Sequence, residues 1–329
     1  MKYAQLGSTG VRVSKISLGT ATFGVSPNPA EAERMVGRAL DLGINLFDCA
    51  NSYGNQARFD RPGLTPAAER ASAEEILGKA LRGKRQHVVL CSKVMEPVGA
   101  GVNERGLSRL HIFDQVENSL RRLGTDHLDV YYAHHPDGNT RIDETLRAFD
   151  DLVRQGKIRY YALSTYPAWQ LIEALWVCDR LGLHTPVCVQ IPYNLALRLP
   201  EADVLPACVR YGISATVFSP LAGGVFSGAA DQPRPIVGHQ RWGGPGFTPR
   251  QLELARQLQE VAAKSGHQPA ALALAWLLTR PGVCSAIIGP ESVTELEVTA
   301  AAGDLELSPE VLQAVNLVGE QPFSIWSMF

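Results

Sequence analysis

The sequence predicts a (β/α)8 barrel, a closed ring of eight parallel strands surrounded by helices. Eight short apolar or β-branched runs alternate with helix-like segments along the 329 residues. Runs such as YYALS and SATVFS are apolar on both faces, as expected for parallel strands that helices cover. The first run is followed by GTATFGVS, which lacks the G-x-G-x-x-G motif of a doubly wound dinucleotide-binding sheet. The barrel is therefore favoured over the doubly wound sheet.

An N-terminal β-hairpin is expected first, because KYAQL and VRVSK flank the turn residues 7–10. The eight expected strands are 16–21, 44–50, 88–94, 129–134, 158–164, 187–192, 214–220 and 284–289. The expected helices between them include 31–42, 113–123, 143–155, 169–181, 203–211, 269–279 and 293–302. Pro29 precedes the first helix, and Gly43 and Gly124 lie where C-cap glycines belong.

The eight strand–helix units use residues 1–329 as one domain, although about 150 residues per domain would suggest two. Two stretches exceed what the barrel requires: residues 55–71 after strand two and residues 225–247 after strand seven. Both are rich in glycine, proline and polar residues, and loops of this length in compact domains are usually functional or disordered. We expect both on the C-terminal face of the barrel, where active sites are built.

Charge and composition exclude several classes of protein. Lys and Arg number 31 against 33 Asp and Glu, which gives no electrostatic reason to expect nucleic acid or an anionic membrane as a partner. No apolar run is long enough to span a bilayer, and the first residues lack the apolar segment of a signal peptide. Six cysteines without a CxxC pair favour a reducing compartment. We therefore expect a soluble cytoplasmic enzyme with a small-molecule partner.

Four polar residues stand at or just after the ends of expected strands two, three and four: Asp48, Tyr53, Lys93 and His134. Any one of them alone is more simply explained as a solvated strand end or a structural ion pair. In a barrel, however, strand ends far apart in sequence converge at one mouth. The four residues are therefore expected to share one site.

The chemistry available to this set is specific. A tyrosine hydroxyl, with a pKa of about 10, is a weak acid at neutral pH unless its phenolate is stabilised. The Lys93 ammonium is expected to lower the pKa of Tyr53, and the Asp48 carboxylate to hold that ammonium. A neutral His134 donates a hydrogen bond to a carbonyl oxygen. The set predicts an acid beside a C=O group that receives a hydride, with no nucleophile–base pair and no metal-ligand spacing.

Longer motifs surround these residues in a fixed order. They are LGSTGVRVSKISLGTATFG, GINLFDCANSYG, SKV, SLRRLGTDHLDVYYAHHPD, LVRQGKIRYYALS, QIPYN, FSPLAGG and AIIGPESVTELE. Over nearly the whole chain the sequence resembles the aldo-keto reductases, and most of all their keto-sugar reductase and potassium-channel β-subunit branches. The resemblance places the family's catalytic tetrad on Asp48, Tyr53, Lys93 and His134. His135 stands where the family usually has Arg or Trp.

The resemblance also implies a nicotinamide dinucleotide bound across the barrel mouth without a Rossmann fold. Its implied contacts are Ser164, Thr165 and Gln190 at the carboxamide, Phe218 under the nicotinamide, Ser219, Leu221, Gly223 and Gly224 at the pyrophosphate, and Gly289, Glu291, Ser292 and Glu295 at the adenosine end. These residue types suit the ligand. Aromatic faces stack on rings, small residues admit phosphate to backbone amides, and Ser292 caps a helix whose N-terminus favours an anion.

Glu291 and Glu295 depart from the pattern, because NADP-preferring members often carry Lys, Arg or Gln at these positions. A carboxylate repels a 2′-phosphate and accepts hydrogen bonds from ribose hydroxyls. The family default is NADP(H), and the two glutamates predict use of, or preference for, NAD(H). The alternative is that Arg280, Arg234 or Arg241 binds the phosphate instead.

The implied activity is reduction of an aldehyde or ketone to an alcohol. The segments VRQGKI and LALAWLLTRPGV resemble members that act on keto-sugars, which favours a sugar-like carbonyl. The alternative from a different class is a regulatory protein that holds cofactor with little turnover, like a potassium-channel β subunit. Phe59 and Trp242 are candidate substrate-facing aromatics, against simple packing within their loops. Cys49 and Cys91 are expected to be packed thiols and not redox sensors.

Overall fold

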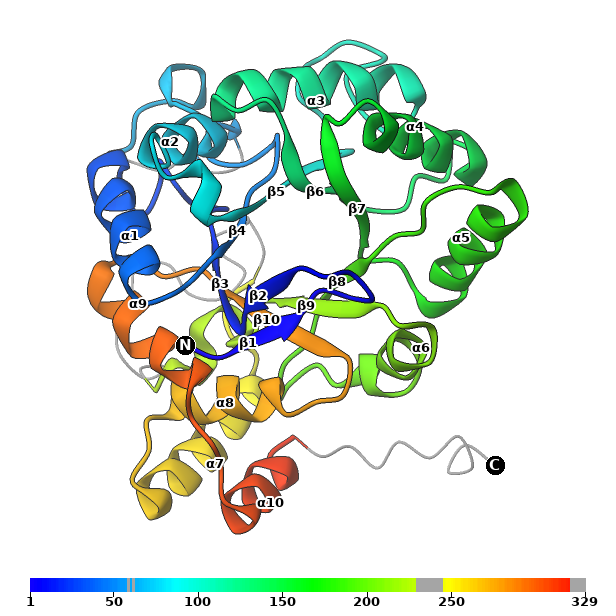
Figure 1. The fold of residues 1–329 in the computed structure, drawn as a ribbon. Helices are drawn as coiled ribbons and strands as arrows, with labels where there is room; N and C mark the ends of the chain where they lie inside the picture. Colours follow the sequence, from blue (N-terminus) through cyan, green and yellow to red (C-terminus); the bar gives the residue numbers. More distant parts are fainter. Residues whose placement is uncertain (58–59, 61–62, 229–244, 320–329) are drawn as a thin grey trace.

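The computed structural model describes residues 1–57, 60, 63–228 and 245–319. Eight parallel strands form a closed barrel in the order β10-β3-β4-β5-β6-β7-β8-β9, which confirms the predicted fold class (Figure 1). The strands are β3 (Ile16–Gly19), β4 (Leu46–Asp48), β5 (Val89–Val94), β6 (Leu128–Ala133), β7 (Ile158–Ser164), β8 (Cys188–Pro192), β9 (Ser214–Phe218) and β10 (Val283–Ile288). No helix in these ranges is long and apolar enough to cross a membrane.

The parallel register brings the carboxyl ends of the strands to one rim. Asp48 is the last residue of β4 and pairs with Cys91 of β5, and Lys93 of β5 pairs with Tyr132 of β6. Further round the ring, the last residue of β7, Ser164, pairs with Gln190 of β8. Several observed strands end earlier than expected, because the chain turns away from the ladder as soon as it passes the rim.

Helices surround the barrel (Figure 1). They are α1 (Pro29–Asp41), α2 (Ala73–Ala80), α3 (Arg109–Leu123), α4 (Ile142–Arg154), α5 (Ala168–Leu181), α6 (Val204–Tyr211), α7 (Pro249–Ser265), α8 (Pro269–Leu278), α9 (Val293–Ala300) and α10 (Pro309–Leu317). Three of them, α2, α7 and α10, lie outside the expected segments. Each nevertheless begins at a side-chain cap, since Ser72, Thr248 and Ser308 each accept a backbone N–H of the first turn.

The predicted N-terminal hairpin consists of β1 (Tyr3–Gln5) and β2 (Arg12–Ser14), which pair in antiparallel fashion. Leu6 and Val13 are fully buried in a cluster with barrel residues such as Val130 and Cys188. The turn of the hairpin packs against the backbone of Val187, which directly precedes β8. It also packs against Gly212, which lies shortly before β9. The hairpin therefore covers the N-terminal end of the barrel and leaves the opposite rim for the site.

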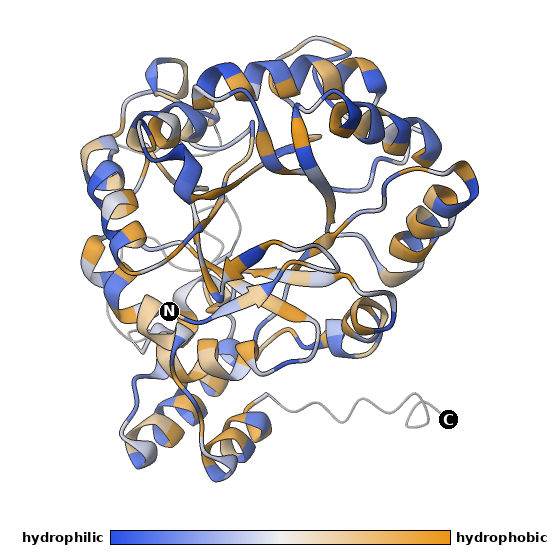
Figure 2. Ribbon diagram, in the orientation of Figure 1, coloured by the Kyte–Doolittle hydropathy of each residue, from blue (hydrophilic) through white to orange (hydrophobic). Residues whose placement is uncertain are grey.

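The main core lies between the barrel and the inner faces of the helices. Figure 2 shows apolar residues on these faces and hydrophilic residues facing outward on the surrounding helices. Helix α8 is the exception, because eight of its side chains, from Ala270 to Leu278, are buried. It is covered in turn by neighbouring helices, including α7, α9 and α10.

Candidate active site

The structure brings together the four residues that the sequence places in one site. The Nζ atom of Lys93 lies 2.5 Å from Asp48 Oδ2 and 3.2 Å from the hydroxyl of Tyr53. The same hydroxyl lies 3.4 Å from Nε2 of His134, which follows β6. Tyr53 occupies the turn after β4, and its ring meets that of His134 edge to face. The four side chains therefore form a continuous polar contact at the C-terminal rim.

Burial and nearby charge shift the pKa values of Lys93 and Tyr53 in opposite directions. Burial is the largest single influence on the pKa of Lys93 and lowers it, but the charges of Asp48 and Tyr53 and the hydrogen bonds to both together raise it above its ordinary value. The ammonium therefore stays protonated although its side chain is 0 % exposed. Burial also raises the pKa of Tyr53, and the charge of Lys93 opposes that shift only in part. Lys93 thus lowers the pKa of Tyr53, as expected, but burial raises it by more, so the net pKa of Tyr53 lies above its ordinary value.

The hydrogen bonds of Lys93 determine how the Tyr53 hydroxyl is used. An ammonium group has three N–H donors and no acceptor. Lys93 directs them to Asp48, to the backbone carbonyl of Cys49 at 3.0 Å and to the oxygen of Tyr53. The Tyr53 oxygen accepts from Lys93, and its own proton points away from the lysine. The arrangement presents an O–H donor beside His134 at the rim.

Gln190 belongs to this network. Its Nε2 donates to Asp48 Oδ1 at 2.8 Å, so that each carboxylate oxygen of Asp48 has a donor. The sequence associates Gln190 only with the carboxamide of a cofactor. Its contact with Asp48 is a finding of the structure, which side-chain periodicity does not signal. Ser164 lies beside it on β7, almost fully buried.

The chain after β9 makes a tight turn with several positive φ angles. Phe218 ends β9 half-buried, and Ser219, Ala222, Gly223 and Gly224 then adopt positive φ angles. The N–H groups of Ala222 and Gly224 donate to the carbonyls of Ser219 and Leu221 at 3.0 and 2.9 Å, so the turn is held by its own backbone. A side chain added at Gly224 or at Gly289 would meet no atom within 4 Å, so both glycines border open space. Leu221 lies in the same turn, before the short helix Ala222–Ser227. The two glycines leave space for a ligand beside this turn.

Carboxylates already occupy the N-terminal amides around α9. Ser292 caps the helix by accepting the N–H of Glu295 at 3.2 Å, and Glu295 Oε2 in turn accepts the N–H of Glu291 at 3.0 Å. Glu31 of α1 accepts the N–H of Val293 at 3.2 Å. Arg34 and this amide lower the pKa of Glu31. Sequence reasoning did not identify Glu31, since no local pattern links positions in α1 and α9.

Of the remaining sequence candidates, only Arg280 is among the described residues. Phe59, Trp242, Arg234 and Arg241 fall outside the described residues, as does most of 225–247. The guanidinium of Arg280 stacks over the ring of Trp276 at 4.8 Å, near Tyr193.

The two cysteines beside the site are packed inside the protein. Burial raises the pKa of both Cys49 and Cys91, which keeps them as unreactive thiols.

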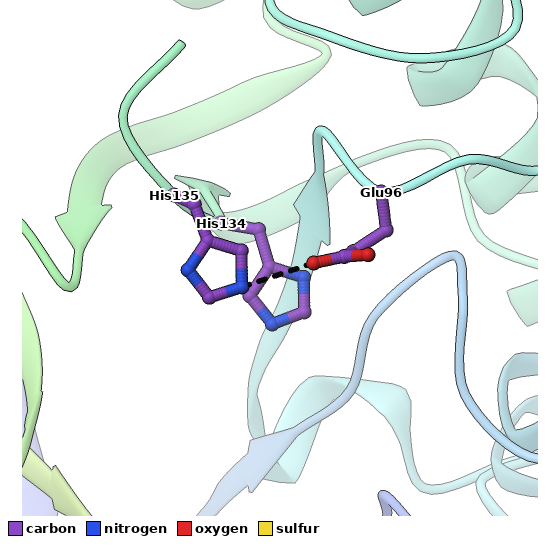
Figure 3. A group of neighbouring side chains, drawn as sticks. All are labelled: Glu96, His134 and His135. Carbon is purple, nitrogen blue, oxygen red and sulfur yellow. Dashed lines mark ion pairs between the residues drawn. The ribbon is translucent and has the colours of Figure 1, made fainter. Parts of the chain in front are cut away.

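A further polar group adjoins the site: Glu96, His134 and His135, whose potential metal-ligand atoms lie within 4.8 Å of one another (Figure 3). The two imidazole rings stack at 4.8 Å with an interplanar angle of only 5°. The lone pairs of their nitrogens lie in the ring planes, so parallel rings do not direct them at a common point. Glu96 instead pairs with His135 Nε2 at 3.0 Å. Glu96 is therefore paired with His135, and the His135 ring stacks on the ring of His134.

A parallel (β/α)8 barrel with polar residues gathered at its C-terminal rim has the architecture of a barrel enzyme. The model of the Aldo/keto reductase family matches residues 15–320, and the chain belongs to this family.

Three relatives show what the chain is similar to. It is 36% identical over 323 residues to the "Uncharacterized oxidoreductase YrpG" of Bacillus subtilis (strain 168), covering 96% of this chain and 95% of that protein. It is 34% identical over 332 residues to a "Probable voltage-gated potassium channel subunit beta" of Oryza sativa subsp. japonica, with coverages of 97% and 96%. A "Putative voltage-gated potassium channel subunit beta" of Schizosaccharomyces pombe is 34% identical over 329 residues, with coverages of 94% and 91%. Family membership supports NAD(P)H-dependent carbonyl reduction in general.

Proposed function

We propose that the protein reduces an aldehyde or ketone to an alcohol, with Tyr53 as the general acid. The observation that carries this proposal is the set of three hydrogen bonds made by Lys93. They fix the ammonium against Asp48 and direct one N–H at the Tyr53 oxygen, which leaves the tyrosine proton for a substrate. His134, within 3.4 Å of the same hydroxyl, lies where it orients a carbonyl oxygen.

The reaction adds one hydride and one proton across the C=O bond. A nicotinamide cofactor bound at the rim would supply the hydride to the carbonyl carbon. Tyr53 gives its proton to the carbonyl oxygen, and the resulting phenolate is stabilised by the Lys93 ammonium. Asp48 holds that ammonium, and Gln190 holds Asp48. Phe218, the positive-φ turn at Gly223 and Gly224, and Gly289 support the proposed cofactor position.

The adenosine end favours NAD(H) over the family default of NADP(H). Glu295 and Glu31 occupy the amides of Glu291 and Val293, to which a phosphate would otherwise bind at this helix N-terminus. A 2′-phosphate placed there meets carboxylates in place of cations. Ribose hydroxyls, by contrast, donate hydrogen bonds to these carboxylates.

The substrate proposed is a sugar-like carbonyl compound. The support is the resemblance of two segments to keto-sugar reductases, together with the polar side chains of Glu96 and His135 beside His134. Hydroxyl groups need such partners when they leave water.

A second candidate function is regulatory, because two of the relatives above are named as potassium channel β subunits. A protein of that kind would hold cofactor and turn over slowly.

The test is a steady-state assay of purified protein with NADH or NADPH and a panel of aldehydes, ketones and sugars. We expect many turnovers per molecule, faster with NADH at equal concentration. A single turnover followed by retention of the oxidised cofactor would favour the regulatory function. Equal or better kcat/KM with NADPH would contradict the cofactor preference while leaving the reductase in place.

A further inference from the structure

Arg70 is a buried arginine in the connection between β4 and α2, and its side chain is only 3% exposed. A buried guanidinium is costly unless its N–H groups find partners. Its Nε donates to the carbonyl of Gly54 at 3.0 Å, Nη2 to that of Gln56 at 2.9 Å and Nη1 to that of Thr65 at 2.7 Å. Nη1 also binds the carboxylate of Asp60 at 2.6 Å. One buried guanidinium therefore binds four described residues of this connection.

The first of these carbonyls belongs to the residue directly after Tyr53. The backbone is held there from a second side, because the carbonyl of Tyr53 accepts the N–H of Ala73, the first residue of α2, at 3.0 Å. Gly54 has a φ of 87°, and a side chain added to it would come within 2.7 Å of the carbonyl oxygen of Phe23. The turn that carries Tyr53 is therefore enclosed by Phe23, Ala73 and the guanidinium of Arg70.

Tyr53 differs from its charged partners in how it is supported. Asp48 and Lys93 lie on β4 and β5, where the strand ladder fixes their backbone. Tyr53 lies beyond the end of β4, and its hydroxyl contacts Lys93 at 3.2 Å and His134 at 3.4 Å. Neither distance is short for a hydrogen bond. The position of the hydroxyl therefore depends on the turn from which the side chain extends.

We propose that Arg70 is a positioning residue for Tyr53, which fixes the turn after β4 and thereby holds the tyrosine hydroxyl where it transfers its proton. This inference rests on the proposed function, in which Tyr53 is the general acid. A planar guanidinium donates in several directions, whereas a lysine ammonium carries its donors on one atom and cannot replace all of these bonds. Misplacement of a reacting group by about 1 Å can slow a reaction by about 100-fold. Loss of Arg70 should therefore slow the reaction while the groups on the strands stay in place.

The experiment measures kcat for a small aldehyde such as propanal at saturating cofactor. Arg70→Ala and Arg70→Lys are compared with the same substitutions at Arg85. Arg85 is a matched control, because it likewise binds two backbone carbonyls and a carboxylate, that of Asp129. It lies before β5, however, at the opposite end of the barrel. Circular dichroism and urea unfolding establish the folded state of each variant, and the lysine variants provide the test where an alanine variant does not fold.

We expect kcat to fall by about 10- to 100-fold in Arg70→Ala and by about tenfold in Arg70→Lys. The Kd of the cofactor should stay close to that of wild type. Millimolar guanidinium chloride should restore part of the kcat of Arg70→Ala, and sodium chloride at the same concentration should not. The Arg85 variants should lose stability, keep kcat close to that of wild type and show no such recovery.

A double variant tests whether Arg70 acts through Tyr53. In the Tyr53→Phe background, Arg70→Ala should cause little further loss of kcat, because the acid that it positions is gone. Losses that multiply in the double variant, or folded Arg70 variants with the kcat of wild type, would overturn the inference and leave the reductase standing. No turnover of any carbonyl compound by wild type, or an unchanged kcat in Tyr53→Phe, would overturn the proposed function as well.

Discussion

The side-chain nitrogen of Gln190 lies 2.8 Å from Asp48 Oδ1, although the two residues are 142 positions apart. The contact joins β8 to β4 across the barrel and supplies the second donor to a buried carboxylate. Gln190→Leu should remove that donor while keeping much of the side-chain volume. We expect the free energy of unfolding to fall by about 1–3 kcal/mol, measured by urea denaturation. The exposed Gln313→Leu is the control, and equal stability of the two variants would contradict the structural role of the contact.

Tyr53→Phe should remove the proton donor and leave the cofactor contacts in place. We expect kcat to fall by about 100-fold or more, since a positioned general acid contributes on this scale. Titration of the cofactor, followed by fluorescence, should give a Kd close to that of wild type. Tyr211→Phe, at an exposed tyrosine on α6, serves as control. A kcat for Tyr53→Phe near that of wild type would rule out Tyr53 as the acid.

Lys93 should make stability depend on alkaline pH. Its pKa is raised in the folded protein above the ordinary value of 10.5. The stabilisation is therefore complete below pH 10.5 and is lost as the pH rises toward the folded pKa, because the unfolded chain releases its proton first. We expect Lys93→Met to be less stable than wild type by about 3–5 kcal/mol at pH 8, since it leaves Asp48 buried without its cation.

The difference in the free energy of unfolding between wild type and Lys93→Met should then shrink above pH 10.5, by up to about 1.4 kcal/mol per pH unit. Urea unfolding between pH 8 and 11.5 measures it. Lys264→Met, at an exposed lysine, is the control for the loss of one positive charge. A difference that stays constant across this range would show that the lysine proton is not coupled to folding.

Glu295→Gln should change the choice of cofactor. Glutamine still accepts the N–H of Glu291 but carries no charge. We expect the ratio of kcat/KM for NADPH to that for NADH to rise on the order of tenfold, because one repulsion toward a 2′-phosphate is removed. Glu297→Gln, on the same helix and paired with Arg38, is the matched control. An equal change in both variants would assign the effect to net charge and not to position.

The sequence predicts the barrel and the meeting of Asp48, Lys93 and His134 for the same physical reason. Buried parallel strands are apolar along their length, so a polar residue at a carboxyl end stands out. The closed ring then brings such ends together. Tyr53 is predicted to join them because it lies in the turn directly after β4. The sequence also predicts the N-cap of α9 at Ser292, since a capping serine lies immediately before its helix.

Contacts between loops and helices of different units leave no comparable pattern. Glu96 reaches His135 from a loop, and Glu31 reaches Val293 from a surface helix. Neither glutamate differs, in sequence, from an ordinary solvated residue. The bond from Gln190 to Asp48 likewise depends on a side-chain orientation that only packing inside the barrel sets. Sequence reasoning therefore finds the residues at strand ends, and it misses the residues that position them.

The N-terminal hairpin bears on the return of the proton after each reaction. Leu6 and Val13 pack with apolar side chains at the end of the barrel opposite the site. The contact of the Lys93 ammonium toward the site rim is the hydroxyl of Tyr53, beside His134. In the proposed function, a Tyr53 that has given up its proton regains it from the same rim that admits the substrate. The proposed reaction would then release its product and return the proton to Tyr53 at the same rim.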